Sequence, residues 1–234
     1  MIVSFQYKFI FIKTHKTAGS SFEKAVGPLC GSADVVTPMD ELRPEEYAKN
    51  YYPNTLLGRF YAKNRLFRKC VSRRSSLLQP WFWEHMPASR VFELVGEKIW
   101  SGFDKVCVER NPWDKVVSYY LWKKHGQGKR MPDFKTYVMT KSHRLPLDGE
   151  LYVNEEGHLM VDHVIQFRKF KSGLQDFMEL KKIPFKGPWP SEKKGERPGR
   201  KPYVDYYDRE SREKIANLFT REIKLFGYEF GSDQ

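Results

Sequence analysis

The chain has 234 residues, and 41 Lys and Arg against 29 Asp and Glu give it a formal net charge of +12 and a pI of about 9.5. With 40% hydrophobic residues it can bury a core of ordinary size, so we expect one domain over residues 1–234. Three cysteines leave an odd one over and show no CxxC spacing, which argues against a disulfide framework and a cysteine metal site.

The positive charge predicts a polyanionic partner or substrate, without choosing between nucleic acid, acidic membrane, acidic glycan and phosphate-rich cofactor. The first residues lack the features of a signal peptide. No segment approaches the roughly 18 to 20 apolar residues of a membrane span. We therefore expect a soluble, cytoplasmic protein with no membrane segment, unless the chain was cut from a membrane-anchored parent.

The chain opens with an apolar strand, Phe9 to Ile12, a basic turn, Lys13 to Ser21, and a helix that begins near Ser20. A helix start presents unpaired N–H groups and about half a positive charge, so this turn is a candidate phosphate site. The candidate contributors are Lys16, Thr17, Gly19, Ser20 and Ser21. The lysine precedes the glycine, unlike in a Walker A motif, which disfavours an ordinary P-loop NTPase. A solvated lysine-rich turn is the alternative.

The rest of the chain alternates strand-like and helix-like segments. Residues 51–79 are expected to form an irregular basic insertion, and residues 184–202 a flexible basic loop. The expected strands are Ala33 to Val36, Phe103 to Val108 and His163 to Phe167, with a hairpin over Leu151 to Met160. The expected helices are Glu41 to Lys49, Pro87 to Lys98, Trp113 to Lys124, Asp133 to Met139, Ser172 to Lys182 and Asp208 to Phe226.

This alternation predicts an α/β fold in which a central parallel sheet is flanked by helices. Ligands of such folds bind beyond the carboxyl ends of the strands. The second strand–turn–helix unit, CVERNPWDKVVSYY, places Arg110 at a strand end and Ser118 about two helical turns further on. Arginine binds phosphate through two N–H groups, and a serine hydroxyl can complete the contact. Alone, this pattern would also suit an arginine paired with a carboxylate and a serine on a helix surface.

Together, KTHKTAGSSF and RNPWDKVVSYY resemble the two cofactor motifs of sulfotransferases that use 3′-phosphoadenosine 5′-phosphosulfate (PAPS). The likeness is greatest to carbohydrate sulfotransferases of the heparan 2-O and chondroitin/dermatan type. In that family the first motif binds the 5′-phosphosulfate at a strand–loop–helix site like that of P-loop kinases, and the second binds the 3′-phosphate. This chain departs from the pattern at His15, Ala18 and Lys115, where the family usually has proline, glycine and arginine.

The resemblance covers most of the chain. It continues through YVDYYDRESREKIANLFTREIKLFGYEF, which is similar to the C-terminal helix of the family. It is weak in DHVIQFRKFKSGLQDF, where Arg168 and Lys169 replace an acidic and an amide residue, so the role of that corner is open. The segments over residues 51–79 and 145–160 have no match.

The resemblance implies transfer of a sulfuryl group from PAPS to a hydroxyl of a glycan acceptor, leaving 3′-phosphoadenosine 5′-phosphate (PAP), with no metal required. Lys16 would neutralise the leaving oxygen. The implied cofactor contacts are Lys16, Thr17, Ala18, Gly19, Ser20, Ser21, Arg110 and Ser118, with Arg200 and Lys201 from the basic loop.

For the base, EHMPASRV resembles the catalytic-histidine segment of the 2-O type, which favours His85. Glu84 is the competing base, and a purely structural His85 under Trp81 and Trp83 is the other alternative. Two other functions fit parts of the pattern. A non-enzymatic protein that binds nucleic acid or another polyanion would explain the charge alone. A nucleotide kinase would explain the first motif, although the missing GK[ST] counts against it.

Overall fold

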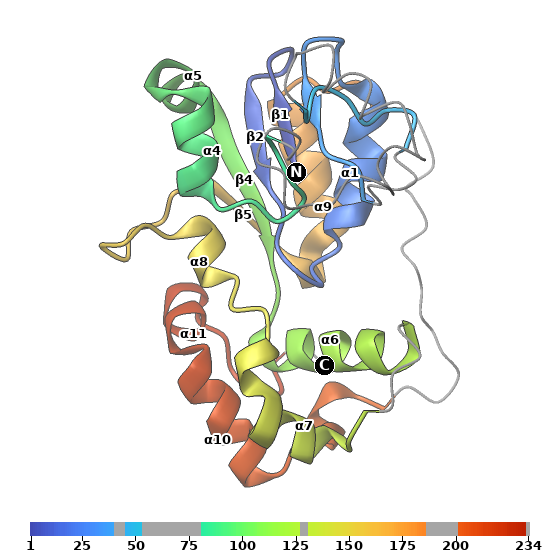
Figure 1. Cartoon of the computed structure of the whole chain (residues 1–234), viewed down its shortest axis with the longest axis vertical. Coiled ribbons are helices and arrows are strands. Elements are labelled where there is room, and N and C mark those ends of the chain that lie inside the picture. Colours follow the sequence, from blue (N-terminus) through green and yellow to red (C-terminus); the bar gives the residue numbers. More distant parts are fainter. Residues whose placement is uncertain (40–44, 53–80, 127–130, 186–200, 233–234) are drawn as a thin grey trace.

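The computed structural model describes residues 1–39, 45–52, 81–126, 131–185 and 201–232 (Figure 1). Its strands are β1 (Ile2–Ser4), β2 (Phe9–Ile12), β3 (Val35–Val36), β4 (Asp104–Glu109) and β5 (His163–Gln166). Its helices are α1 (Gly19–Val26), α4 (Ala88–Val95), α5 (Glu97–Gly102), α6 (Pro112–Gly126), α7 (Phe134–Lys141), α8 (Gly149–Tyr152), α9 (Phe170–Leu180), α10 (Arg209–Leu218) and α11 (Thr220–Phe226). The α/β class is confirmed.

The five strands form one mixed sheet in the order β3-β1-β2-β4-β5, so the parallel sheet expected from the sequence is only part of it. β2, β4 and β5 are parallel to one another, as expected, whereas β1 is antiparallel to both β2 and β3. The sequence interpretation missed β1. Only four residues separate it from β2, with Lys8 at φ 53°, and so short a connection can join only antiparallel strands.

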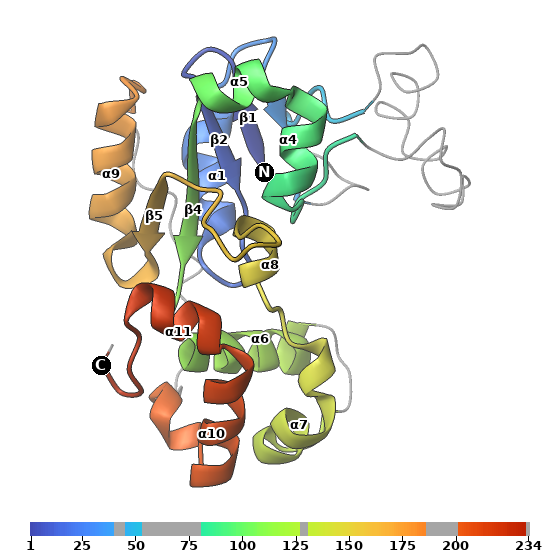
Figure 2. The same cartoon turned by 90° about the vertical axis from the view of Figure 1, so that its left-hand side faces the viewer.

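Helices cover both faces of the sheet, and the strands alternate their side chains between the two layers (Figures 1 and 2). Ile10, Ile12 and Cys107 pack into a cluster with α4 and α8. Phe9, Phe11, Val106 and Val108 point the other way, into a cluster with α1 and α9. The two buried faces explain why β2, with the sequence FIFI, is a continuous apolar run rather than an alternating one.

A third apolar cluster lies beyond the carboxyl ends of β4 and β5 and contains α6, α7 and α10 (Figure 1). The chain enters it directly from β4, because Pro112 begins α6 three residues after the strand ends. Asn111 holds this junction: its Oδ1 accepts from the Trp113 N–H at 3.1 Å, and its Nδ2 donates to the Glu229 carbonyl at 3.0 Å. Helix α6 therefore lies across the sheet edge at which a ligand site is expected.

Several predicted elements differ in detail. The helix expected over Pro87 to Lys98 is two helices, α4 and α5, because Gly96 takes a left-handed φ of 76°. The helix expected over Asp208 to Phe226 also divides, at Phe219. The hairpin over Leu151 to Met160 is reduced to a turn and one bridge, between Val153 and Leu159, since residues 149–152 are helical.

Other expectations fall wholly or partly outside the described residues. The irregular insertion lies there except for Tyr51 and Tyr52, which are buried. The basic loop lies there over residues 186–200. The helix expected over Glu41 to Lys49 is not helical in its described part, where Lys49 pairs with Val36 through a bridge instead.

Candidate functional site at the carboxyl edge of the sheet

The loop between β2 and α1 contains two non-glycine residues in the left-handed region, Lys16 at φ 60° and Ala18 at φ 66°. Helix α1 begins at Gly19 without a side-chain cap. The N–H groups of Ser21 and Phe22 are satisfied by the Ala18 carbonyl, at 2.8 and 3.1 Å. The N–H groups that precede them in the loop and first turn remain the part of this helix start that can receive an anion.

The hydroxyl groups of the loop divide into two kinds. Thr17 is buried, and its Oγ1 lies 2.7 Å from Oγ1 of Thr14 and 3.2 Å from the Thr14 carbonyl. Thr14 in turn donates to the carbonyl of Val108 on β4. The Thr17 hydroxyl therefore fixes the loop to the sheet. The sequence predicts Thr17 as a ligand contact and does not reveal this structural role. Ser20 is exposed and Ser21 half-buried, so their hydroxyls can meet a ligand.

Arg110 joins the two sequence motifs. It follows β4 directly and is 7% exposed. Its Nη1 donates to the carbonyl of Lys16 at 2.9 Å, and its Nε donates to Asp114 at 2.7 Å. The guanidinium carbon lies 4.1 Å from the centre of the Phe167 ring. The turns after β2, β4 and β5 thus meet at one arginine.

Ser118 lies on the side of α6 that faces the loop. Asp114, Ser118 and Trp122 are spaced four residues apart, so they form one stripe along the helix. At one end of this stripe Asp114 holds Arg110, and at the other the Lys16 ammonium lies 5.3 Å from the centre of the Trp122 indole. Ser118 lies one helical turn from each of these two residues on the same stripe, so the prediction that its hydroxyl meets a ligand stays a prediction.

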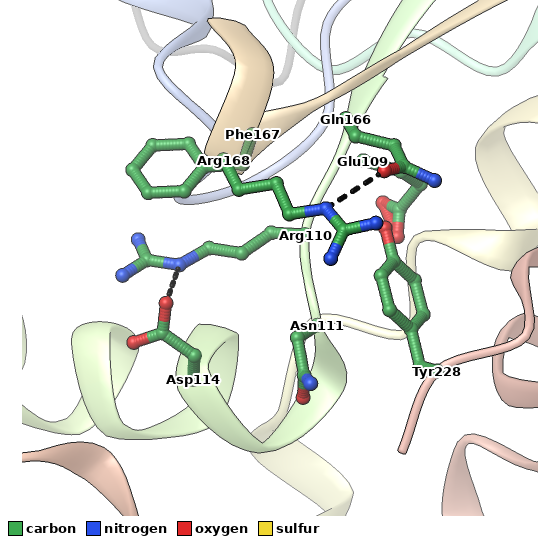
Figure 3. A pocket seen from close by; sticks show the side chains of 8 residues that line it. All are labelled: Glu109, Arg110, Asn111, Asp114, Gln166, Phe167, Arg168 and Tyr228. Atoms are coloured by element: carbon green, nitrogen blue, oxygen red, sulfur yellow. Dashed lines mark hydrogen bonds and ion pairs between the residues drawn. The ribbon is translucent and has the colours of Figure 1, made fainter. Parts of the chain in front are cut away.

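A cavity of about 140 Å³ opens beside Arg110 (Figure 3). Arg168 reaches into it from the segment after β5, with its Nε donating to Gln166 at 3.0 Å. The segment after β5, whose role the sequence left open, therefore contributes a second arginine to this edge. Arg168 and Lys169 are both exposed, but of the two only Arg168 lines the cavity. The full lining is Glu109, Arg110, Asn111, Asp114, Gln166, Phe167, Arg168 and Tyr228.

Lys13 ends the apolar run of β2 and is buried, with an exposed fraction of 3%. Its ammonium is paired with Glu23 of α1 and with Glu84. The side chain crosses closely under Gly19, where an added Cβ would lie 2.8 Å from Cγ of Lys13. Lys13 is a residue of the site that sequence analysis missed, although a lysine directly after four apolar strand residues is a visible signal.

Two histidines stack at the end of β2. The rings of His15 and His85 have centroids 3.6 Å apart and an interplanar angle of 15°. Nδ1 of His85 lies 2.9 Å from the Lys13 carbonyl, and Nε2 lies 3.9 Å from Glu84. Burial, and then the charge of His15, lower the pKa of His85 to about 4. His85 and Glu84 are thus placed beside the loop, where the sequence predicts the base.

A fully buried ion group lies behind the loop. Nζ of Lys115 donates to Glu109 at 2.7 Å and 3.0 Å and to Asp148 at 3.0 Å. Burial raises the pKa of Glu109 to about 7, against the opposing effect of Lys115. Burial alone would raise the pKa of Asp148 too, but Lys115 and His15 outweigh it and hold this pKa below its ordinary value. Lys115, a departure from the family motif, is therefore an internal counter-ion.

The other expected contacts are placed as follows. Lys201 is exposed and has no hydrogen bond or ion pair with the loop in the described part of the chain. Arg200 lies outside the described residues. Among the described residues, no group of three or more His, Cys, Asp or Glu side chains could hold a metal ion. None of the described helices combines the length and the apolar character that crossing a membrane would require.

Comparison with known proteins adds little to this geometry. No protein-family model matches the chain, and no solved structure matches it. An uncharacterized protein of Archaeoglobus fulgidus is 42% identical over 53 residues, which are 23% of this chain and 44% of that protein. The chain thus spans less than half the length of this relative, whose description states no activity.

Proposed function

We propose that the protein is a PAPS-dependent sulfotransferase that transfers a sulfuryl group to a hydroxyl of a carbohydrate acceptor. The observation that carries the proposal is the 2.9 Å hydrogen bond from Arg110 to the Lys16 carbonyl. It joins two motifs that are 94 residues apart in sequence, at the carboxyl ends of parallel strands. The sequence resemblance requires both motifs to hold one nucleotide, and this contact supports that requirement.

The donor set fits a ligand with two separate phosphate groups. At one end, the start of α1, the Lys16 ammonium and the accessible Ser20 and Ser21 hydroxyls suit a 5′-phosphosulfate. At the other end, Arg110 and Ser118 suit a 3′-phosphate. Arg110 already uses the N–H of Nε and one N–H of Nη1 within the protein, so Nη2, which has no hydrogen bond with the described residues, and the second N–H of Nη1 remain as donors for a ligand.

When bound, PAPS supplies a sulfuryl group on a phosphate leaving group. Catalysis then requires positioning, neutralisation of negative charge on the leaving oxygen and removal of the acceptor proton. The Lys16 ammonium and the α1 N–H groups provide the positive field. For the proton, the candidates from the sequence are His85 and Glu84. Glu84 is already paired with the buried Lys13, whereas the low pKa of His85 keeps it neutral at pH 7.

The test is a thermal-shift and calorimetric titration with PAP, AMP and ATP. Binding at 100 times Kd would stabilise the fold by about 2.7 kcal/mol, which is a rise in Tm of about 5–10 °C for a domain of this size. We expect PAP to bind at least tenfold more tightly than AMP, without Mg²⁺. Equal binding of PAP and AMP would refute the proposal, and a preference for ATP with Mg²⁺ would favour the kinase alternative.

Two variants sharpen this test. Arg110→Ala should lower PAP affinity towards that of AMP, because it removes the 3′-phosphate contact. Lys16→Ala should abolish PAPS consumption while weakening PAP binding less. Lys124→Ala, an exposed lysine on α6, is the control for loss of one positive charge. If all three changes weaken PAP binding equally, and the weakening depends on the salt concentration, the protein would instead be a non-enzymatic polyanion binder.

A further inference from the structure

His15, in the loop between β2 and α1, is held by Asp148 through two hydrogen bonds. Asp148 accepts hydrogen bonds from the backbone N–H of His15 at 2.9 Å and from its Nδ1 at 2.6 Å. These two bonds fix the ring relative to its own backbone. Asp148 is 1% exposed and stands immediately before α8, some 130 residues away in sequence. A carboxylate that binds both the backbone N–H and the ring of one histidine is an arrangement that the two cofactor motifs do not explain.

We propose that His15, oriented by Asp148, is the general base that accepts the proton of the acceptor hydroxyl. This inference rests on the proposed sulfuryl transfer. It replaces His85 and Glu84, the bases expected from the sequence, with a residue at a position where the family usually has proline. His15 is the catalytic residue in this scheme, and Asp148 is a positioning residue that acts through it.

The hydrogen bonds determine the tautomer of His15. Lys115 and His15 hold the pKa of Asp148 low, so this side chain is a carboxylate and can only accept. Nδ1 of His15 must therefore carry the hydrogen, and the lone pair is on Nε2. The ring is 33% exposed, so Nε2 can meet a substrate. This is the orientation that the aspartate imposes on the histidine of serine protease triads.

His85 lacks the corresponding support for a positive charge. Its Nδ1 donates to a neutral acceptor, the Lys13 carbonyl, at 2.9 Å. The two rings are stacked at 3.6 Å, so a proton on one of them disfavours a proton on the other. The Asp148 carboxylate lies 2.6 Å from Nδ1 of His15, whereas the Glu84 carboxylate lies 3.9 Å from Nε2 of His85 and is paired with Lys13. The His85 side chain is also the less exposed of the two, at 26% against 33% for His15. The proton therefore goes to His15.

Other charged groups also face this pair of histidines. Glu84 lies 3.9 Å from Nε2 of His85 and would favour a charge there, but it is paired with Lys13. Glu23 of α1 shares the same lysine. Lys115 faces Asp148 from α6 and is paired with Glu109 of β4. Each carboxylate around His85 is thus offset by a lysine, while Asp148 keeps one oxygen, Oδ1, directed at His15.

The proton balance of the step follows from this geometry. The acceptor O–H bond breaks, its proton goes to Nε2 of His15, and the oxygen lone pair forms the new bond to sulfur. The bond from sulfur to the phosphate oxygen breaks, and its electron pair stays on the phosphate. Lys16, the next residue in the chain, neutralises that oxygen, so base and counter-charge come from adjacent positions of one loop. His15 then returns the proton to solvent.

The first experiment observes the rings directly and needs no acceptor. Long-range ¹H–¹⁵N correlation NMR of the histidine rings, between pH 4 and 8, reports the tautomer and the order of protonation. His15→Gln and His85→Gln spectra assign the two signals. We expect His15 as the Nδ1–H tautomer and His85 to stay neutral until the pH nears 4. A His15 with hydrogen on Nε2, or a His85 that is already protonated near pH 6.5, would overturn the inference.

The second experiment measures conversion of PAPS to PAP with desulfated heparin and chondroitin as acceptor probes. His15→Gln should lower kcat about 10²- to 10⁴-fold with unchanged PAP binding, and Asp148→Asn should do the same while changing the pH profile. If Asp148→Asn fails to fold, His15→Gln decides alone. Full activity of His15→Gln would refute the base assignment. Wild-type protein that neither binds PAP nor consumes PAPS would refute the proposed function itself. The NMR experiment would still show whether Asp148 sets the tautomer of His15.

Discussion

Gly19 shows how closely the first motif is packed. A Cβ at this position would lie 2.8 Å from Cγ and 3.1 Å from Cε of Lys13. Lys13 cannot easily move aside, because Glu23 and Glu84 hold its ammonium. The glycine is therefore required by the buried lysine beneath it, in addition to any approach of a ligand from above.

Gly19→Ala should lower the free energy of unfolding by about 1–3 kcal/mol, the usual cost of overpacking. Urea unfolding followed by fluorescence measures this value. Ser20→Ala, one residue further along α1 and exposed, should change it by less than about 0.5 kcal/mol. Equal effects of the two changes would contradict the close packing of Gly19 on Lys13.

His85 should make the protein sensitive to acid. Burial and the charge of His15 lower its pKa from 6.5 to about 4, so the folded state favours neutral His85. Well above pH 6.5, His85 is neutral in both the folded and the unfolded chain, so its lowered pKa does not change the free energy of unfolding. As the pH falls from about 6.5 to about 4, the unfolded chain binds a proton that the folded chain does not, and the free energy of unfolding falls. Below about pH 4 the loss is complete.

His85→Gln should remove this contribution of His85 to the pH dependence of the free energy of unfolding. Between pH 7 and pH 4.5 the variant should lose about 2 kcal/mol less unfolding free energy than the wild type, given about 1.4 kcal/mol per pKa unit. Urea denaturation at the two pH values gives the comparison. His158→Gln changes an exposed histidine in a turn and should follow the wild type. A His85→Gln curve parallel to the wild-type curve would show that His85 is not held neutral.

At the scale of the elements, helix α9 packs closely against the sheet at Gly173. A Cβ on Gly173 would lie 2.8 Å from Cγ2 of Ile165, a buried residue of β5. Gly102, in α5, has nothing within 4 Å of the same added atom. Both glycines are helical and neither has a positive φ, so they form a matched pair that separates helix propensity from packing.

Gly102→Ala should stabilise the protein by up to about 1 kcal/mol through helix propensity. Gly173→Ala gains the same term but must move α9 away from β5, so we expect net destabilisation of about 1–2 kcal/mol. Thermal unfolding followed by circular dichroism shows whether each change stabilises or destabilises the protein. Stabilisation by both changes would mean that α9 can shift without cost and that its contact with β5 is loose.

At the scale of the whole molecule, the ion group around Lys115 connects the sheet to the helical cluster beyond it. Lys115 belongs to α6, Glu109 ends β4, and Asp148 precedes α8. All three are essentially inaccessible to solvent. Removing one partner of such a group leaves charges buried without compensation, which is far more costly than losing a surface pair.

Lys115→Met should therefore destabilise the protein by about 3–5 kcal/mol, measured by denaturant unfolding. Lys124→Met, on the exposed side of the same helix, should change stability by less than about 0.5 kcal/mol. Adding Glu109→Gln to Lys115→Met should restore part of the loss, because a neutral amide needs no counter-ion. A mild effect of Lys115→Met alone would show that water reaches this group.

The sequence by itself determined the α/β class, the apolar runs of β2, β4 and β5, and the turns after them that carry Lys16 and Arg110. These features depend on local composition and periodicity. It did not reveal β1, because three residues are too few to show a period, and it did not show that the chain leaves helical geometry at Gly96 and Phe219.

Only the tertiary structure decided which charges meet. Asp148 lies 133 residues from His15, and Glu84 lies 71 residues from Lys13, so no spacing rule relates them. Burial then makes these pairings strong, because charges removed from water must be matched. The tertiary structure likewise turned the Thr17 hydroxyl inwards, made Lys115 a counter-ion and brought His15 against Asp148.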